Sequence, residues 1–179
     1  GMNVWSNHVK SFGLGNFLNN DLAVGRKGRI PDGEYYDKAY GKGRWASTYI
    51  VSNAIGQGEV EATPIQLTNM VAAIANRGYY YTPHVIKSIE EDTIDSNFTT
   101  PKQTTVDKQH FNPVIHGMYD VYNKGTASML QVDGIEICGK TGTAENPHGA
   151  DHSVFIAFAP KDNPKIAIAV FVENGYWGS

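Results

Sequence analysis

The sequence has one cysteine, Cys138, among 179 residues. A single cysteine excludes an internal disulfide and any metal site built from several cysteines. Long apolar runs are also missing, since no segment approaches the ~18 residues that a membrane-spanning helix requires. Strong charge is absent too, because the net charge is −3 and no long basic run occurs. We therefore expect a globular domain with no nucleic-acid partner, in which Cys138 is a buried apolar residue on a strand.

The length and composition of the chain limit the number of domains that it can form. A chain of 179 residues, 41% of them hydrophobic, can enclose one core, so we expect one domain over residues 1–179. Gly1-Met2 resembles the remnant of a removed tag.

One helix has predicted boundaries at both ends. Thr63 is expected to be its N-cap, Pro64 its first residue and Gln66 the capping-box partner, with Gly78 just past its end. Its expected apolar face consists of Leu67, Met70, Val71 and Ile74. Residues 3–12 have helical spacing and are expected to be the last turns of another helix.

A further helix is predicted to begin at Asn112-Pro113, again with an N-cap followed by proline, and to end at Lys124-Gly125. Its expected apolar face consists of Val114, Met118, Val121 and Tyr122.

Three longer strands are predicted near the end of the chain, at residues 134–144, 154–158 and 165–173. The last is almost wholly apolar, which predicts a central strand buried on both faces. The turn at 160–164 should join the last two strands as a hairpin. With short strands at 79–81 and 85–89, the fold class is α+β: an antiparallel sheet with packed helices.

Two segments show no periodicity and are expected to be loops. Residues 15–48 form a long loop after which residues 52–59 make a glycine-spaced turn, and residues 90–105 form a polar loop or hairpin. Six basic residues of the first segment are expected on a solvated surface, with a patch for an anionic partner as the alternative: Arg26, Lys27, Arg29, Lys38, Lys42 and Arg44.

The candidate site is the stretch from Gly139 to Glu145. On a strand at a sheet edge, Lys140 would supply positive charge, and Thr141 and Thr143 would donate hydrogen bonds to an anionic acyl substrate. Gly142 removes a side chain, so a substrate could lie close to the backbone. The backbone N–H of Thr143 is a candidate donor to a developing oxyanion.

The same residues match the phosphate-binding pattern G-x-x-x-x-G-K-[ST], from Gly134 to Thr141. That pattern requires a loop before the lysine and a helix after it. Here residues 135–138 alternate as in a strand, and Gly142, Asn146 and Pro147 would interrupt a helix. A P-loop nucleotide-binding protein is therefore the weaker hypothesis.

With Lys140-Thr141-Gly142 on a strand, the chain resembles the transpeptidase domain of penicillin-binding proteins, most of all the class B, elongation-type, penicillin-binding protein 2-like enzymes. The resemblance extends from about Phe12 to the end of the chain. It rests also on Ile55-Gly56-Gln57-Gly58-Glu59, Ala62-Thr63-Pro64-Ile65-Gln66-Leu67, Asn76-Arg77-Gly78, Thr82-Pro83-His84, Gly125-Thr126-Ala127, Ala157-Phe158-Ala159-Pro160 and Val172-Glu173-Asn174-Gly175.

The resemblance implies a serine acyltransferase that cross-links peptidoglycan stem peptides and is acylated by β-lactams. It implies substrate binding by Lys140, Thr141, Gly142 and Thr143, and no cofactor. It also implies cell-elongation proteins as partners, and a membrane-anchored parent protein on the periplasmic face of the bacterial inner membrane. We also expect no metal site, because His148 and His152 have a spacing that suits metal binding on a helix but lie in a predicted loop and strand.

Two motifs of that family are missing. No serine is followed by lysine three places on, so S-x-x-K with the nucleophile is absent, and no serine has asparagine two places on. We therefore expect a partial domain, the C-terminal portion of a transpeptidase domain, inactive alone. The alternative is a penicillin-binding-like module that has lost catalysis and only binds a partner.

Overall fold

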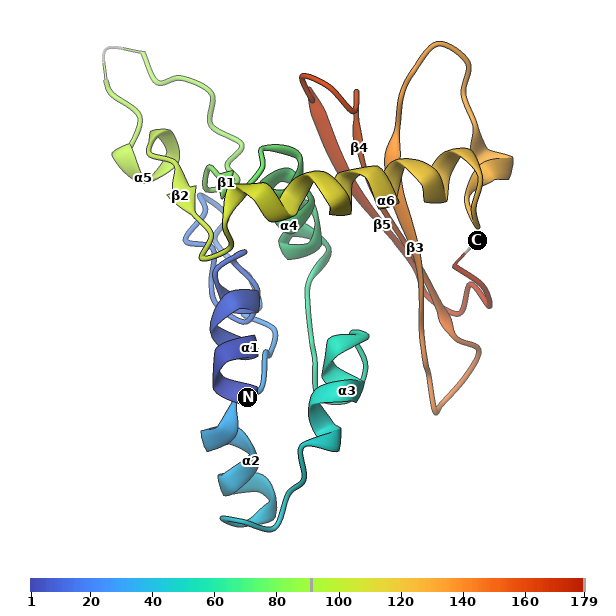
Figure 1. Ribbon diagram of the computed structural model, residues 1–179. Helices are drawn as coiled ribbons and strands as arrows, with labels where there is room; N and C mark the ends of the chain where they lie inside the picture. Colours follow the sequence, from blue (N-terminus) through green and yellow to red (C-terminus); the bar gives the residue numbers. More distant parts are fainter. Residues whose placement is uncertain (91, 179) are drawn as a thin grey trace.

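The computed structural model describes residues 1–90 and 92–178, and it confirms the α+β class. The helices are α1 (Met2–Lys10), α2 (Gly33–Tyr40), α3 (Thr48–Ala54), α4 (Pro64–Ala75), α5 (Ser96–Thr99) and α6 (Phe111–Asn123), with short 3₁₀ helices η1 (Lys108–His110) and η2 (Ser128–Leu130). The strands are β1 (Tyr79–Tyr80), β2 (Lys102–Gln103), β3 (Cys138–Ala144), β4 (His152–Ala159) and β5 (Ile166–Val172). Figure 1 shows α1, α2 and α3 on one side of the molecule and the sheet of β3, β4 and β5 on the other.

The main sheet is antiparallel with the order β3-β4-β5, and the predicted hairpin of β4 and β5 is confirmed. The prediction that the last strand is central was wrong, because β4 is central and β5 lies at an edge. On β5, Ala167 packs towards the core, whereas the larger side chains at alternate positions are exposed. An apolar run does not reveal which of its two faces another element covers.

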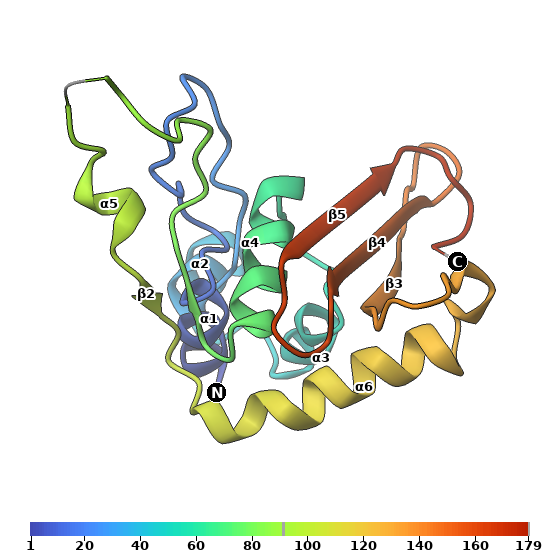
Figure 2. The ribbon, with the colours of Figure 1, turned by 90° about the horizontal axis from the view of Figure 1, so that it is seen from above.

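Helices α4 and α6 enclose the core against one face of this sheet, as Figure 2 shows. The buried core residues are Val71, Ala75, Phe111, Ile115, Met118, Cys138 and Phe158. Cys138 is fully buried on β3, as predicted, and burial raises the pKa of its thiol to about 11. A thiol with that pKa is protonated at neutral pH and unreactive.

Helix α4 has the predicted start. The Thr63 hydroxyl accepts from the Gln66 backbone N–H, and the Gln66 side chain accepts from the Thr63 N–H, which completes the capping box. At the other end Gly78 donates to the Ala73 carbonyl at 2.9 Å, while Arg77 takes the left-handed conformation with φ of 61°. This is a Schellman turn, so Gly78 lies past the end as predicted.

Helix α6 begins at Phe111, so the prediction of Asn112 as its N-cap was wrong. The turn η1 precedes it, and the Asp107 side chain caps that turn. Asn112 instead accepts a hydrogen bond from the Arg77 guanidinium. The buried face of α6 consists of Phe111, Ile115, Met118 and Tyr122. The prediction of Met118 and Tyr122 is confirmed, whereas Val114 and Val121 are not among the buried residues.

Three further assignments from the sequence were wrong. Residues 85–89 do not form a strand, because the Val85 and Ile86 N–H groups bind the Asp21 carboxylate. Residues 134–137 lie before β3 rather than within it. The segment 90–105 contains α5 and β2, and its residue 91 lies outside the described residues.

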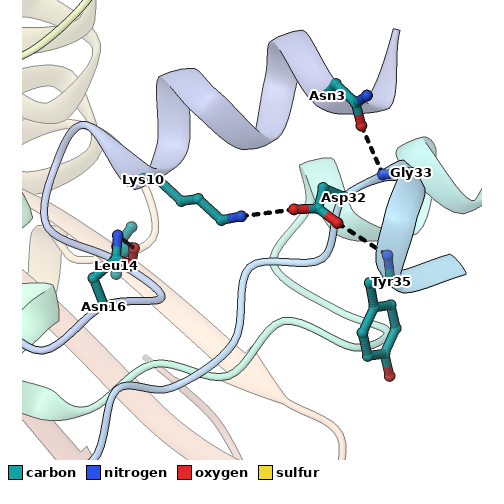
Figure 3. A network of polar contacts seen from close by, with 7 residues as sticks. All are labelled: Asn3, Lys10, Leu14, Asn16, Asp32, Gly33 and Tyr35. Atoms are coloured by element: carbon teal, nitrogen blue, oxygen red, sulfur yellow. Dashed lines mark hydrogen bonds and ion pairs between the residues drawn. The ribbon is translucent and has the colours of Figure 1, made fainter. Parts of the chain in front are cut away.

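The predicted loop over residues 15–48 contains helix α2, and the predicted turn at 52–59 begins inside α3. Figure 3 shows how α2 starts: Asp32 accepts from the Tyr35 N–H at 3.0 Å and pairs with the Lys10 ammonium at 2.9 Å. The apolar face of α2 is formed by tyrosines, with Tyr36 fully buried. A periodicity search based on aliphatic residues overlooks such a helix.

Candidate active-site strand and its cleft

Strand β3 carries the four predicted substrate-binding residues, and it forms an edge of the sheet. In an antiparallel ladder, alternate residues turn both backbone groups towards the partner strand and the others turn both away. The Thr143 carbonyl accepts from the Gln57 side-chain amide at 3.3 Å, which lies outside the sheet. Thr143 and, two residues away, Thr141 therefore present their backbone N–H and carbonyl groups at the open edge.

The two polar side chains at the start of this strand have defined contacts. The Lys140 ammonium donates to the Thr141 carbonyl at 2.6 Å and remains exposed. The Thr141 hydroxyl lies 2.9 Å from the Thr126 hydroxyl, which belongs to the turn after α6. Thr126 thus fixes the direction of the Thr141 hydroxyl, a role that its sequence position did not indicate.

The far end of the strand is covered by the last described residues. The Thr143 hydroxyl accepts from the Gly178 N–H at 3.2 Å. The Ser153 hydroxyl, opposite Thr143 on β4, donates to the Trp177 carbonyl. The Thr143 side chain therefore points to one face of the sheet, while its backbone points to the free edge.

A cleft of about 480 Å³ lies on the face of the sheet that carries Lys140 and Gly142. The segment before α4, together with Leu67 near the start of α4, forms the opposite wall. Its main lining residues are Ile55, Gln57, Val60, Leu67, Val154, Ile156 and Phe171. The cleft is thus mostly apolar, with Lys140 as its positive charge.

The wall opposite β3 is held by polar contacts with α2. The Glu59 carboxylate accepts from the Tyr36 hydroxyl at 2.5 Å and from the Tyr40 hydroxyl at 2.8 Å. Arg29 and Glu61 exchange two backbone hydrogen bonds of 2.8 Å, and their side chains pair at 2.6 Å. One basic residue of the predicted surface cluster, Arg29, therefore has a structural partner.

The two glycines of the strand have different roles. A Cβ on Gly139 would come within 2.8 Å of the Phe155 ring, whereas a Cβ on Gly142 would meet only Val154, at 3.5 Å. The first glycine is thus required by packing within the chain. At Gly142 the chain itself tolerates a methyl group, so the space there is available to a ligand.

This difference predicts opposite stability effects. Gly139→Ala should destabilise the chain by about 1–3 kcal/mol through overpacking, and Gly142→Ala should change its stability by less than about 0.5 kcal/mol. Urea denaturation followed by circular dichroism measures both. An equal loss for the two variants would mean that Gly142 has a packing role and would contradict the assignment.

The P-loop hypothesis does not fit this geometry. Residues 138–144 form a continuous strand in register with β4, where a phosphate-binding loop would need a loop and then a helix.

The family model of the penicillin binding protein transpeptidase domain matches residues 1–179. The chain belongs to the penicillin-binding protein transpeptidase family. Within this family it is similar to the peptidoglycan D,D-transpeptidase MrdA of Acinetobacter baumannii, with 32% identity over 99% of the chain and 28% of the relative. MrdA of Escherichia coli K12 is also 32% identical, over 98% of the chain and 31% of the relative.

Solved structures of penicillin-binding proteins have the same fold. Penicillin-binding protein 2 of Pseudomonas aeruginosa, in complex with WCK 5153, matches with a TM-score of 0.90 and 34% identity, over 100% of this chain and 39% of that one. Penicillin-binding protein 2 of Helicobacter pylori in complex with MreC has a TM-score of 0.78 and 30% identity, over 93% and 31%. The predicted resemblance to penicillin-binding protein 2 is confirmed, and the chain spans less than a third of the length of the MrdA relatives.

Every helix within residues 1–90 and 92–178 is too short or too polar to cross a membrane.

Proposed function

We propose that the protein containing this chain is a serine D,D-transpeptidase of the penicillin-binding protein 2 type, and that β3 is its substrate-binding strand. The supporting observation is the free edge of β3, where Thr141 and Thr143 present outward backbone groups beside Lys140 and its cleft. An extended peptide can add to such an edge through main-chain hydrogen bonds.

In the proposed reaction, a serine oxygen attacks the carbonyl carbon of the penultimate D-alanine. The bond to the terminal D-alanine breaks, its nitrogen leaves with the serine proton, and an ester to the serine remains. An amine of a second stem peptide then attacks the ester, forms the cross-linking amide and returns the proton to the serine. A β-lactam acylates the same serine when its ring amide opens.

Each residue of the strand has a part in this proposal. Lys140 pairs with the carboxylate of the terminal D-alanine, and the outward backbone groups of Thr141 and Thr143 hold the peptide at the edge of the strand. Gly142 leaves room for the peptide backbone. The outward N–H of Thr143 donates to the oxyanion that forms at the attacked carbonyl.

The nucleophile is proposed to lie outside residues 1–179. None of the serines of this chain begins an S-x-x-K motif, and the matched relatives are more than three times as long. By similarity to penicillin-binding protein 2, we place the whole protein at the periplasmic face of the inner membrane, with a protein of the cell-elongation machinery as a partner. The neighbour in complex with MreC supports a partner of that kind.

Intact-mass spectrometry after incubation with a penicillin tests this assignment. The full-length protein should gain the mass of one drug molecule, and residues 1–179 alone should gain none, because an acyl-enzyme needs the activated serine. An adduct on the isolated chain would mean that it contains a nucleophile of its own. A full-length protein without an adduct would refute the transpeptidase assignment.

A further inference from the structure

Gln57 lies on the turn between α3 and α4, and its side chain reaches across the cleft to β3. Its Nε2 donates to the Thr143 carbonyl at 3.3 Å, although the two residues are 86 positions apart. Gln57 thus connects the wall of the cleft opposite β3 with a backbone carbonyl at the open edge of β3.

The turn holds Gln57 in this orientation. Its backbone N–H donates to the Ser52 carbonyl at 3.1 Å. The flanking residues Gly56 and Gly58 have φ values of 79° and 68°, which side-chain-bearing residues adopt at a cost. Directly after the turn, the Glu59 carboxylate is fixed by two tyrosine hydroxyls. These contacts hold the backbone around Gln57 so that its side chain lies at the free edge of the strand.

The contact itself is easily exchanged. At 3.3 Å it is longer than the 2.7–3.2 Å range of ordinary N–H···O bonds, so a ligand loses little by replacing it. A glutamine side chain has two N–H donors and one carbonyl acceptor, and thus matches both groups of a peptide unit. A peptide that added to β3 at Thr143 would lie within reach of this amide.

We propose that Gln57 determines specificity for extended peptides, by hydrogen bonding one backbone amide of the acyl-donor peptide beside Thr143. This inference rests on the proposed function of β3 as the substrate-binding strand. Lys140 and Thr143 hold the terminal carboxylate and the attacked carbonyl. Gln57 binds the backbone of the acyl-donor peptide at a position further from the reacting bond.

The test combines amide-to-ester replacement in the substrate peptide with substitution of Gln57 in the full-length protein. The probes are a peptide ending in D-alanyl-D-alanine and analogues in which one backbone amide at a time is an ester, which lacks the N–H. The measured quantity is kcat/KM for release of D-alanine, by the wild type and by Gln57→Leu and Gln57→Met. We expect the wild type to lose about tenfold in kcat/KM at one ester position, the effect of about one hydrogen bond. Gln57→Leu should lose less than about twofold at the same position.

The control is Gln131→Leu, which removes a similar bond away from the cleft, since Gln131 donates to the Asn123 carbonyl at 2.6 Å. This variant should discriminate between amide and ester as the wild type does. Equal discrimination by the wild type and Gln57→Leu would overturn the inference, because Gln57 would then act only through the strand. Gln57→Met keeps the length of the side chain without its amide, and it decides the same question if the leucine variant does not fold. A wild type that releases no D-alanine and forms no penicillin adduct would instead refute the proposed function itself.

Discussion

Lys140→Ala in the full-length protein is expected to lower kcat/KM for a peptide ending in D-alanyl-D-alanine by about 100-fold. Lys140 is the positive charge of the cleft, and its ammonium lies 2.6 Å from a carbonyl at the open edge. A hydrogen bond between charged groups contributes about 1.5–3 kcal/mol, which corresponds to roughly 10- to 200-fold. Steady-state release of D-alanine measures the effect.

Two variants sharpen this experiment. Lys165→Ala removes an exposed lysine just before β5 and should leave kcat/KM unchanged. Lys140→Arg keeps the charge but replaces a compact ammonium with a planar guanidinium, so only part of the activity should return. If Lys140→Ala kept the wild-type kcat/KM, the role of this lysine in carboxylate binding would be refuted.

The parts of the fold that the sequence predicted depend on local chemistry. The start of α4 follows from Thr63 and Gln66, which are three residues apart and satisfy each other's backbone. The hairpin of β4 and β5 likewise follows from a short turn. The position of β5 in the sheet could not be predicted, because it depends on which strands pair and not on the composition of one strand.

The candidate site likewise contains residues that could be predicted from the sequence and residues that could not. The residues from Lys140 to Thr143 could be chosen from the sequence because they are consecutive on one strand. Gln57 and Thr126 could not, since the fold alone brings them to β3 from 86 and 15 positions away. Helix α2 was overlooked although it anchors the wall of the cleft, because its buried side chain, Tyr36, is aromatic and carries a hydroxyl group.

The second prediction with a large expected effect concerns the stability of the protein and a residue of α2, Tyr36. Tyr36→Phe removes the hydroxyl that donates to Glu59 and accepts from the Asn53 amide at 2.9 Å. Asn53 is 2% exposed, so its amide would lose a partner inside the protein. We expect a loss of about 2 kcal/mol, from a charged hydrogen bond and an unsatisfied buried group, and a decrease in Tm of roughly 4–8 °C. Thermal unfolding measures it, and Tyr81→Phe, at an exposed tyrosine, should change Tm little.

The pH dependence separates this hydrogen bond from simple packing. Burial opposes ionisation of Glu59, but the hydroxyls of Tyr36 and Tyr40 outweigh it, and the pKa of Glu59 lies below its ordinary value of 4.5. A lowered pKa stabilises the folded state above the unfolded pKa, and this contribution is lost as the pH falls through the folded pKa. The difference in stability between wild type and Tyr36→Phe should therefore be constant near neutral pH and shrink below about pH 4.5.

At the alkaline end the sign is reversed. Burial and the Glu59 carboxylate raise the pKa of Tyr36 from 10.0 to about 12, so the neutral phenol stabilises the folded state below pH 10 and this stabilisation is lost as the pH rises towards 12. Tyr36→Phe lacks the titrating group and should lose less stability over that interval. A stability difference that stays constant from pH 3 to pH 12 would show that the Tyr36 hydroxyl is not coupled to the ionisation of Glu59. Glu59 would then not hold the wall of the cleft through this hydroxyl.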